Sequence, residues 1–226
     1  MKETKKVAIQ GIKGSFHDIA AHRYFEGEQI QLLCFDTFEE VFECLHQDQD
    51  AVALVAIENT IAGSLLHNYE LLRESGATIV GEHKLRISHS IMCLPEDNWA
   101  DITEVNSHPV ALMQCRDFLA SHPSMKVVEV ADTAGAAAQI SMLRQRGHAA
   151  ICHKDAAEIY GMKVLQTGIE TNKHNFTRFL VLSRPEKAGR CASNRMPTRP
   201  GWPSRCRTRK VRSVPSCPYS PSTNSI

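Results

Sequence analysis

The apolar run at residues 51–57 constrains the fold more than any other feature of this chain. Its sequence, Ala-Val-Ala-Leu-Val-Ala-Ile, holds no polar side chain. A strand buried on both faces has this pattern, and such strands occur where helices cover a parallel sheet on both sides. Strand-like and helix-like patterns alternate around it, which favours an α/β fold. We expect strands at 7–11, 31–35 and 51–57 and helices at 15–25, 38–46 and 64–75, with capping-box spacing between Ser15 and Asp18.

The second half of the chain repeats the alternation after two strand-like stretches, 78–85 and 86–94. The pattern predicts two small α/β lobes with a cleft between them, an arrangement that resembles the type II architecture of periplasmic binding proteins. We place lobe 1 at about residues 1–85 plus 172–188, and lobe 2 at about 86–171. We expect further helices at 107–121, 132–145 (capped by Asp132 and ended by Gly147) and 154–160, and strands at 127–130, 149–152 and 179–183.

The last segment, residues 189–226, differs in composition from the rest. It holds eight basic residues, no acidic residue and six of the ten prolines. Such a composition cannot bury a core, so we expect a disordered basic tail or, as the favoured hypothesis, a segment translated out of frame. Without it, 18 basic residues remain against 25 acidic ones, a net charge of −7 for residues 1–188. This acidic body argues against nucleic-acid binding.

The N-terminal residues and the cysteines indicate the compartment. The chain begins with a polar segment and not with an apolar signal sequence, and no run is long enough to span a membrane, so we expect a cytoplasmic protein without membrane contact. Five cysteines are scattered over the body without a Cys-x-x-Cys pair. We therefore expect reduced core cysteines, no metal site and no cofactor.

Two strand-to-helix turns carry residues suited to binding an anion. Residues 11–16 read Gly-Ile-Lys-Gly-Ser-Phe, and residues 57–64 read Ile-Glu-Asn-Thr-Ile-Ala-Gly-Ser. Ligands of open α/β sheets bind at the carboxyl ends of strands, where glycine lets the backbone approach and helix N–H groups attract negative charge. The same residues also serve as ordinary turn and capping residues. The candidates from these turns are Ser15, Asn59, Thr60, Gly63 and Ser64.

Two later motifs supply further candidates. Residues 107–109 read Ser-His-Pro, with Ser107 expected as a helix N-cap and His108 facing the cleft. Residues 175–179 read Asn-Phe-Thr-Arg-Phe and combine the hydroxyl of Thr177, the fixed charge of Arg178 and the apolar ring of Phe176. On spacing alone, this motif is more typical of a strand edge with one outward arginine.

Taken in this order, the motifs resemble the prephenate dehydratase family over about residues 6–184. The most specific parts are Ser107-His108-Pro109-x-Ala-Leu-x-Gln-Cys, Asp-Thr-Ala at 132–134 and Thr177-Arg178-Phe at the last strand. The resemblance implies conversion of prephenate to phenylpyruvate, with Thr177 in catalysis and a homodimer or homotetramer. Members often have proline, serine and serine where this chain has Ile12, His17 and Thr60. Bacterial members usually continue into a phenylalanine-binding ACT domain that residues 189–226 do not resemble, so feedback inhibition is expected to be absent.

The resemblance leaves alternatives open. Arogenate dehydratase performs the same chemistry on the amino analogue, and a non-catalytic two-lobed protein would bind a small anion without turnover. For the dehydratase, we expect Arg178 to engage a substrate carboxylate, with Lys13 at the cleft rim, and Phe176 to wall the ring. His108 is a second candidate for proton transfer because its side-chain type titrates near neutral pH.

Overall fold

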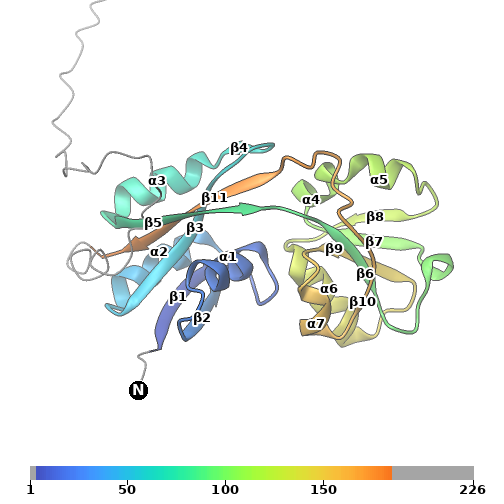
Figure 1. Cartoon of the computed structure of the whole chain (residues 1–226), viewed down its shortest axis with the longest axis horizontal. Coiled ribbons are helices and arrows are strands. Elements are labelled where there is room, and N and C mark those ends of the chain that lie inside the picture. The colour runs from blue at the N-terminus through green and yellow to red at the C-terminus, as the bar shows by residue number, and fades with distance from the viewer. Residues whose placement is uncertain (1–3, 185–226) are drawn as a thin grey trace, which may run out of the picture. The chain divides into compact units, whose positions relative to one another are not determined.

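The structure is a computed structural model that describes residues 4–184, all within one compact unit. The predictions for residues 189–226 concern residues outside this range. Two sheets, each with its own helices, form two lobes, which confirms the two-lobed α/β architecture (Figure 1). None of the helices in residues 4–184 is long and apolar enough to cross a membrane.

Lobe 1 is built on a sheet with the strand order β2-β1-β3-β11-β5, and β4 pairs with β3. β1 is parallel to β2 and β3, whereas β11 is antiparallel to β3 and β5. The elements are β1 (Lys5–Gln10), α1 (Phe16–Tyr24), β2 (Ile30–Phe35), α2 (Phe38–Gln47), β3 (Ala51–Asn59), β4 (Gly63–Ser64), α3 (Leu66–Ser75), β5 (Thr78–Arg86) and β11 (Phe176–Ser183).

Strand β3 is buried on both faces, as its apolar run predicts. Leu54 packs in a core cluster with Ile19 of α1, whereas Val55 packs in a second cluster with Val41 and Phe42 of α2. Successive residues of a strand point to opposite faces, so a strand between two helical layers must be apolar throughout. This burial fixes the position of Asn59 at the carboxyl end of β3.

Lobe 2 has the strand order β10-β6-β9-β7-β8. β7 is parallel to β8 and β9, and β6 is antiparallel to β9 and β10. Its elements are β6 (Ser90–Cys93), a 3-10 turn (Trp99–Asp101), β7 (Glu104–Ser107), α4 (Pro109–Gln114), α5 (Arg116–Ala120), β8 (Lys126–Glu129), α6 (Thr133–Leu143), β9 (His148–Cys152), α7 (Ala156–Tyr160) and β10 (Lys163–Thr167).

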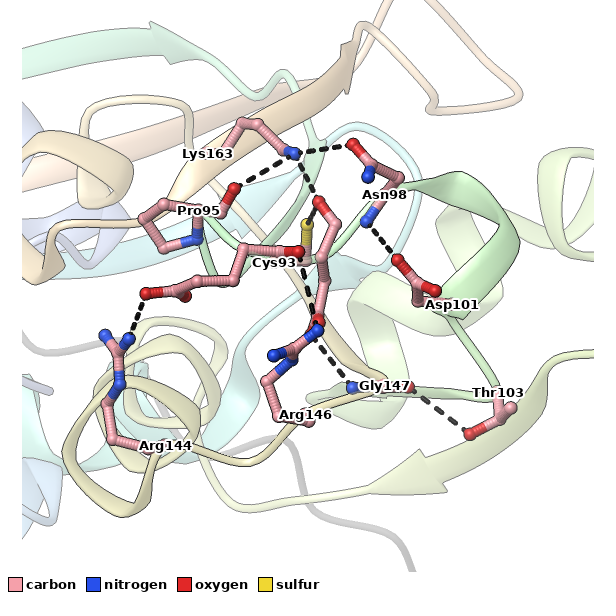
Figure 2. Close-up of polar contacts among 11 residues, drawn as sticks. Cys93, Pro95, Asn98, Asp101, Thr103, Arg144, Arg146, Gly147 and Lys163 are labelled. Atoms are coloured by element: carbon pink, nitrogen blue, oxygen red, sulfur yellow. Dashed lines mark hydrogen bonds and ion pairs between the residues drawn. The ribbon is translucent and has the colours of Figure 1, made fainter.

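The buried carboxylate of Asp97 organises the loop between β6 and β7. Asp97 accepts hydrogen bonds from Arg146 Nε and from the Gly147 N–H at 2.9 Å, which joins this loop to the turn before β9 (Figure 2). Lys163 Nζ donates to the backbone oxygens of Pro95 and Asp97. These contacts lie before the amino ends of β7 and β9, and ligands of open α/β sheets bind at the opposite, carboxyl ends.

Two segments connect the lobes, one between β5 and β6 and one between β10 and β11 (Figure 1). They are hydrogen-bonded to each other. The Ile87 N–H donates to the Asn175 carbonyl at 2.8 Å, and the Ile169 N–H donates to the His89 carbonyl at 3.0 Å. The buried carboxylate of Glu170 accepts the His89 N–H at 2.9 Å. The paired segments therefore form a common connection from which His89 and Asn175 extend.

Four sequence predictions are wrong in detail. The helix expected at 107–121 is divided at Cys115 into α4 and α5. The helix expected from residue 64 begins at Leu66, because Gly63 and Ser64 pair with β3 as β4. Helix α6 ends at Leu143, since Arg144 adopts a left-handed conformation, so Gly147 does not end it. The strand expected at 86–94 is β6 alone, because residues 87–89 belong to a connecting segment. β10 has no counterpart among the expected strands.

Candidate active site

Thr177 lies on the buried face of β11, opposite the end of β3. Its register partner is Asn59, and the Asn59 side-chain Nδ2 donates to Thr177 Oγ1 at 2.9 Å. Both side chains are buried. Because β3 and β11 are neighbours in the sheet, they bring together two residues from separate sequence motifs.

The orientation of the Asn59 amide follows from its other contacts. Asn59 Oδ1 accepts the N–H groups of Ile61 and Ala62, each at 2.9 Å. The oxygen must face these two donors, so Nδ2 faces Thr177 and Asn175, whose Oδ1 accepts at 2.8 Å. Thr177 Oγ1 is therefore an acceptor from Asn59, and its own proton remains available for another acceptor.

The hydrogen bonds continue into lobe 2. Asn175 Nδ2 donates to Oε1 of Gln114, at the end of α4, over 2.8 Å. His89 Nε2 contacts the same Oε1 at 2.8 Å. We call Thr177, Asn59, Asn175, Gln114 and His89 the polar chain. All five side chains are buried, and a buried polar group is costly unless it is paired, so these contacts specify one arrangement.

The turn at residues 11–16 approaches lobe 2 closely. A Cβ on Gly14, whose φ is +84°, would lie 3.1 Å from the Ala156 side chain, so glycine is required for both conformation and space. The Tyr160 hydroxyl donates to the Lys13 carbonyl at 2.5 Å. A tyrosine is already protonated at neutral pH, and burial raises the pKa of Tyr160 further, to about 12, so the hydroxyl stays a donor in mildly alkaline solution as well.

Ser15 is the N-cap of α1, and its Oγ accepts the Asp18 N–H at 3.3 Å. The second half of the expected capping box differs, because the Asp18 carboxylate accepts the Gly14 N–H at 2.7 Å and not that of Ser15. This carboxylate makes the start of α1 less favourable for an anionic ligand. The Phe16 ring packs edge-on against His89 at 5.3 Å, so the turn adjoins the polar chain.

Ser107 is not a helix cap, contrary to the sequence prediction. It is the last residue of β7, and its hydroxyl donates to the Ile151 carbonyl of β9 at 2.5 Å. The cap is His108, whose Nδ1 accepts the Val110 N–H at 3.2 Å. The chain must leave the sheet before a helix can begin, which moves the cap one residue on. Asp132, at the start of α6, is close enough to His108 for electrostatic interaction. Burial raises the pKa of the Asp132 carboxyl, and hydrogen bonds from backbone N–H groups partly oppose this rise.

Thr60, Gly63 and Ser64 are exposed around the hairpin between β3 and β4. Thr60 Oγ1 donates to the His174 carbonyl at 3.0 Å and accepts the Phe176 N–H at 3.0 Å. These contacts hold the start of β11 beside the hairpin. The structure thus gives Thr60 a role in placing the strand that carries Thr177.

Arg178 and Phe176 alternate with Thr177 along β11, so their side chains leave the strand on its other face. Arg178 is exposed and donates from Nε and Nη2 to Glu82 Oε2, at 3.1 and 2.6 Å. The Phe176 ring lies 4.6 Å from Lys84 Nζ. The structure does not bring either side chain beside Thr177. The outward arginine matches the alternative interpretation, but the strand edge does not, because β11 lies between β3 and β5.

Three members of the polar chain were missed as site residues by the sequence reasoning: His89, Gln114 and Asn175. Gln114 and Asn175 stand inside motifs that were recognised, next to the candidates chosen there. His89 follows a strand and has no recognisable motif. A run of three polar residues between two isoleucines, as in Ile87-Ser88-His89-Ser90-Ile91, is the signal that could have identified it. Within residues 4–184, no group of three or more His, Cys, Asp or Glu side chains could hold a metal ion.

Comparison with known families gives one extended match. A family model described as prephenate dehydratase matches residues 7–187. A bifunctional N-acyl-homoserine lactone acylase/prephenate dehydratase from Komagataeibacter europaeus is 34% identical over 184 residues, covering 81% of this chain and 64% of that protein. Arogenate dehydratase/prephenate dehydratase 2 from Arabidopsis thaliana is 37% identical over 180 residues, covering 79% and 46%. The chain therefore spans about half to two thirds of the length of these relatives.

Solved structures agree with the fold. A prephenate dehydratase from Arthrobacter aurescens in complex with L-Phe superposes with a TM-score of 0.72 at 24% identity, covering 80% of this chain and 60% of that one. The enzyme from Staphylococcus aureus gives a TM-score of 0.67 at 27% identity, covering 79% and 66%. The two-lobed arrangement is thus shared with these proteins.

Proposed function

The chain belongs to the prephenate dehydratase family, and on this premise we propose that it converts prephenate to phenylpyruvate with loss of water and carbon dioxide. The observation that carries the proposal is the hydrogen bond from Asn59 to Thr177. It occupies the hydroxyl oxygen as an acceptor and leaves the hydroxyl proton free for a leaving group. We assign the activity to residues 1–188, as expected from the sequence.

The reaction breaks two bonds of prephenate. In prephenate, the bond between the ring and its carboxylate breaks and releases carbon dioxide, and the electron pair enters the ring. The bond to the ring hydroxyl breaks at the other end, and the departing hydroxide takes up a proton to become water. The ring becomes aromatic, which drives the reaction, so the protein has to hold a dianion and assist the departure of hydroxide.

Thr177 is proposed to donate its hydroxyl proton in a hydrogen bond to the departing oxygen. A threonine hydroxyl is a poor acid, so it polarises the leaving group or relays a proton whose final source is another group or water. General acid assistance contributes roughly 10²–10⁴-fold to a rate. His108 remains a second candidate for proton transfer.

Gln114 is proposed as a further substrate contact. Its Oε1 is occupied by Asn175 and His89, whereas its Nε2 has no hydrogen-bond partner among residues 4–184. Gln114 is linked to Thr177 through Asn175 and Asn59, and a free amide N–H there could donate to an anionic substrate. Direct substrate binding by the other sequence candidates remains a prediction for Ser15, Asn59, Thr60, Gly63, Ser64, Ser107 and Phe176. The same prediction for Arg178 is opposed by its ion pair with Glu82.

The test is turnover of prephenate by the purified chain at neutral pH, followed as phenylpyruvate formation. Prephenate converts spontaneously in acid, so a reaction without enzyme is the control. Arogenate is assayed in parallel, because relatives named as arogenate dehydratases match equally well. Faster turnover of arogenate would transfer the assignment to that substrate, and turnover of neither by folded protein would contradict the proposal.

We also propose that the protein acts in the cytoplasm as a homodimer or homotetramer, without nucleic-acid or membrane partners. The support is the family resemblance, together with the net negative charge of residues 1–188, which disfavours nucleic-acid binding. Light scattering of the purified protein tests the assembly, and a mass of one chain would contradict it.

A further inference from the structure

His89 is a buried histidine that the proposed reaction does not yet use. Its backbone is fixed on both sides, because the N–H donates to Glu170 Oε2 at 2.9 Å and the carbonyl accepts the Ile169 N–H at 3.0 Å. Its ring packs against the Phe16 edge at 5.3 Å. The side chain therefore has one placement, with Nε2 directed at Gln114 Oε1, 2.8 Å away.

The tautomer of His89 follows from the direction of the polar chain. The Ile61 and Ala62 N–H groups fix Asn59, Asn59 fixes Asn175, and the Asn175 amide donates to Gln114 Oε1. Gln114 Oε1 is thus an acceptor, so His89 Nε2 must carry a proton. His89 Nδ1 is buried and has no hydrogen-bond partner among the described residues. Burial lowers the pKa of His89, which favours this neutral form.

The two donors at Gln114 Oε1 set the orientation of the whole amide. One donor comes from His89 in the first connecting segment, and the other from Asn175 in the second. A flipped amide would direct Nε2 at two buried donors and leave both unpaired. With both donors present, the N–H groups of Gln114 can point only away from them.

We propose that His89 is a positioning residue that acts through Gln114. Its Nε2–H holds the Gln114 amide so that the amide N–H groups are presented to the substrate beside Thr177. The inference rests on the proposed function, because it deepens the assignment of the same site. A positioning role differs from a purely structural one, because the effect of His89 on turnover must then depend on the Gln114 side chain.

Three substitutions separate these roles. In His89→Gln, a side-chain amide can donate from a position close to the original Nε2, whereas the shorter His89→Asn cannot reach Gln114. We expect His89→Gln to retain kcat/KM for prephenate within about threefold, and His89→Asn to lose about 10- to 100-fold, as for a misplaced reacting group. Gln114→Leu provides the background for a double-mutant cycle. In the Gln114→Leu background, adding His89→Asn should cause no further loss of kcat/KM, because the amide that His89 positions is gone.

Two kinetic results would overturn the inference while the proposed function stands. One is full activity of His89→Asn, and the other is a loss from His89→Asn that is as large in Gln114→Leu as in the unchanged chain. Thermal unfolding of each variant shows whether it is folded. Nitrogen NMR of the imidazole gives a readout without turnover, and we expect a neutral ring protonated on Nε2. A ring protonated on Nδ1 or on both nitrogens at neutral pH would overturn the inference, even if the chain turned over neither prephenate nor arogenate.

Discussion

The Asn59 amide donates to the Thr177 hydroxyl oxygen over 2.9 Å, across the boundary between β3 and β11. The two residues stand 118 positions apart in the sequence and meet because their strands are neighbours in one sheet. The amide cannot be reversed, because its oxygen already accepts two backbone N–H groups. A hydroxyl held in this way has one lone pair engaged by Asn59, and its proton is available to a further acceptor.

Replacing Thr177 by valine removes the hydroxyl with little change of shape. We expect kcat for prephenate to fall by about 10²-fold or more, because the leaving hydroxyl loses its hydrogen-bond donor. Stability should fall by about 0.5–1.5 kcal/mol, since Asn59 Nδ2 loses the Thr177 acceptor but keeps the Phe176 carbonyl at 3.2 Å. Thr177→Ser, which keeps the hydroxyl, is the matched control and should retain most of the activity. A loss of less than about tenfold in Thr177→Val would remove Thr177 from the chemistry.

Arg178 is expected to matter less for substrate binding than its place in the Thr-Arg-Phe motif indicates. Its guanidinium pairs with Glu82 on the face of β11 opposite Thr177. Arg178→Gln should therefore change KM for prephenate by less than about threefold, as expected of an exposed ion pair outside the site. Steady-state kinetics, with Glu82→Gln as the matched variant, test this. A rise in KM of tenfold or more in Arg178→Gln alone would restore the carboxylate clamp that the sequence predicts.

Much of the fold could be predicted because hydrophobic periodicity reports burial directly. The run at 51–57 indicated a strand covered on both sides, and Asp132 was identified as the cap of α6. The division of the 107–121 helix at Cys115 could not be seen, because the apolar spacing continues through the break. The pairing of Gly63 and Ser64 with β3 is a local hairpin, but the same two residues also suit the start of the helix that the sequence predicts from residue 64, so the pattern does not separate the two structures.

The candidate site was predictable residue by residue only where a motif marked it. Thr177 and Asn59 were both found, yet nothing in the sequence showed that they touch. Strand alternation separates Arg178 from Thr177, although the two residues stand in one motif. His89 and Asn175 come from the two connecting segments, and the pairing between these segments is visible only in three dimensions.

The hydrogen bond from Tyr160 to the Lys13 carbonyl joins the turn at 11–16 to α7. Tyr160→Phe removes this contact and keeps the ring. We expect KM for prephenate to rise about two- to tenfold with a small change in kcat, because one hydrogen bond contributes about 0.5–1.5 kcal/mol to the arrangement that holds the substrate. Tyr69→Phe, at an exposed tyrosine of α3, is the control. An unchanged KM in Tyr160→Phe would show that the contact does not contribute to substrate binding.

Asp97 is expected to affect stability and not activity. Its buried carboxylate accepts from Gly147 N–H and Arg146 Nε before the amino end of β9 (Figure 2). Asp97→Ala leaves the Gly147 N–H unpaired and should lower the free energy of unfolding by about 1–3 kcal/mol. Both kcat and KM should remain unchanged below the unfolding temperature. Urea unfolding measures the loss, and the exposed Glu96→Gln should have little effect. A changed KM in folded Asp97→Ala would connect this loop to the site.

The last prediction concerns His17, where family members often have serine. Its half-buried ring packs edge-on against Phe179 at 5.1 Å, and its Nε2 accepts the Ala56 N–H at 3.4 Å. Burial lowers the pKa of His17 from 6.5 to about 4. The unfolded chain therefore binds a proton as pH falls below 6.5, whereas the folded chain binds it only near pH 4. This group should thus leave stability unchanged above pH 6.5 and lower it as pH falls towards 4.

The lowered pKa gives the size of the effect, about 2 kcal/mol at about pH 5 and no more than about 3 kcal/mol in stronger acid. His17→Gln keeps an acceptor for the Ala56 N–H and cannot be protonated in this range. Its free energy of unfolding should fall less between neutral pH and about pH 5 than that of the unchanged chain. Urea unfolding at both pH values measures the difference. His83, His89 and His153, whose pKa values burial also lowers, remain in both proteins and contribute equally. An identical loss in the two proteins would show that His17 is not part of the acid sensitivity.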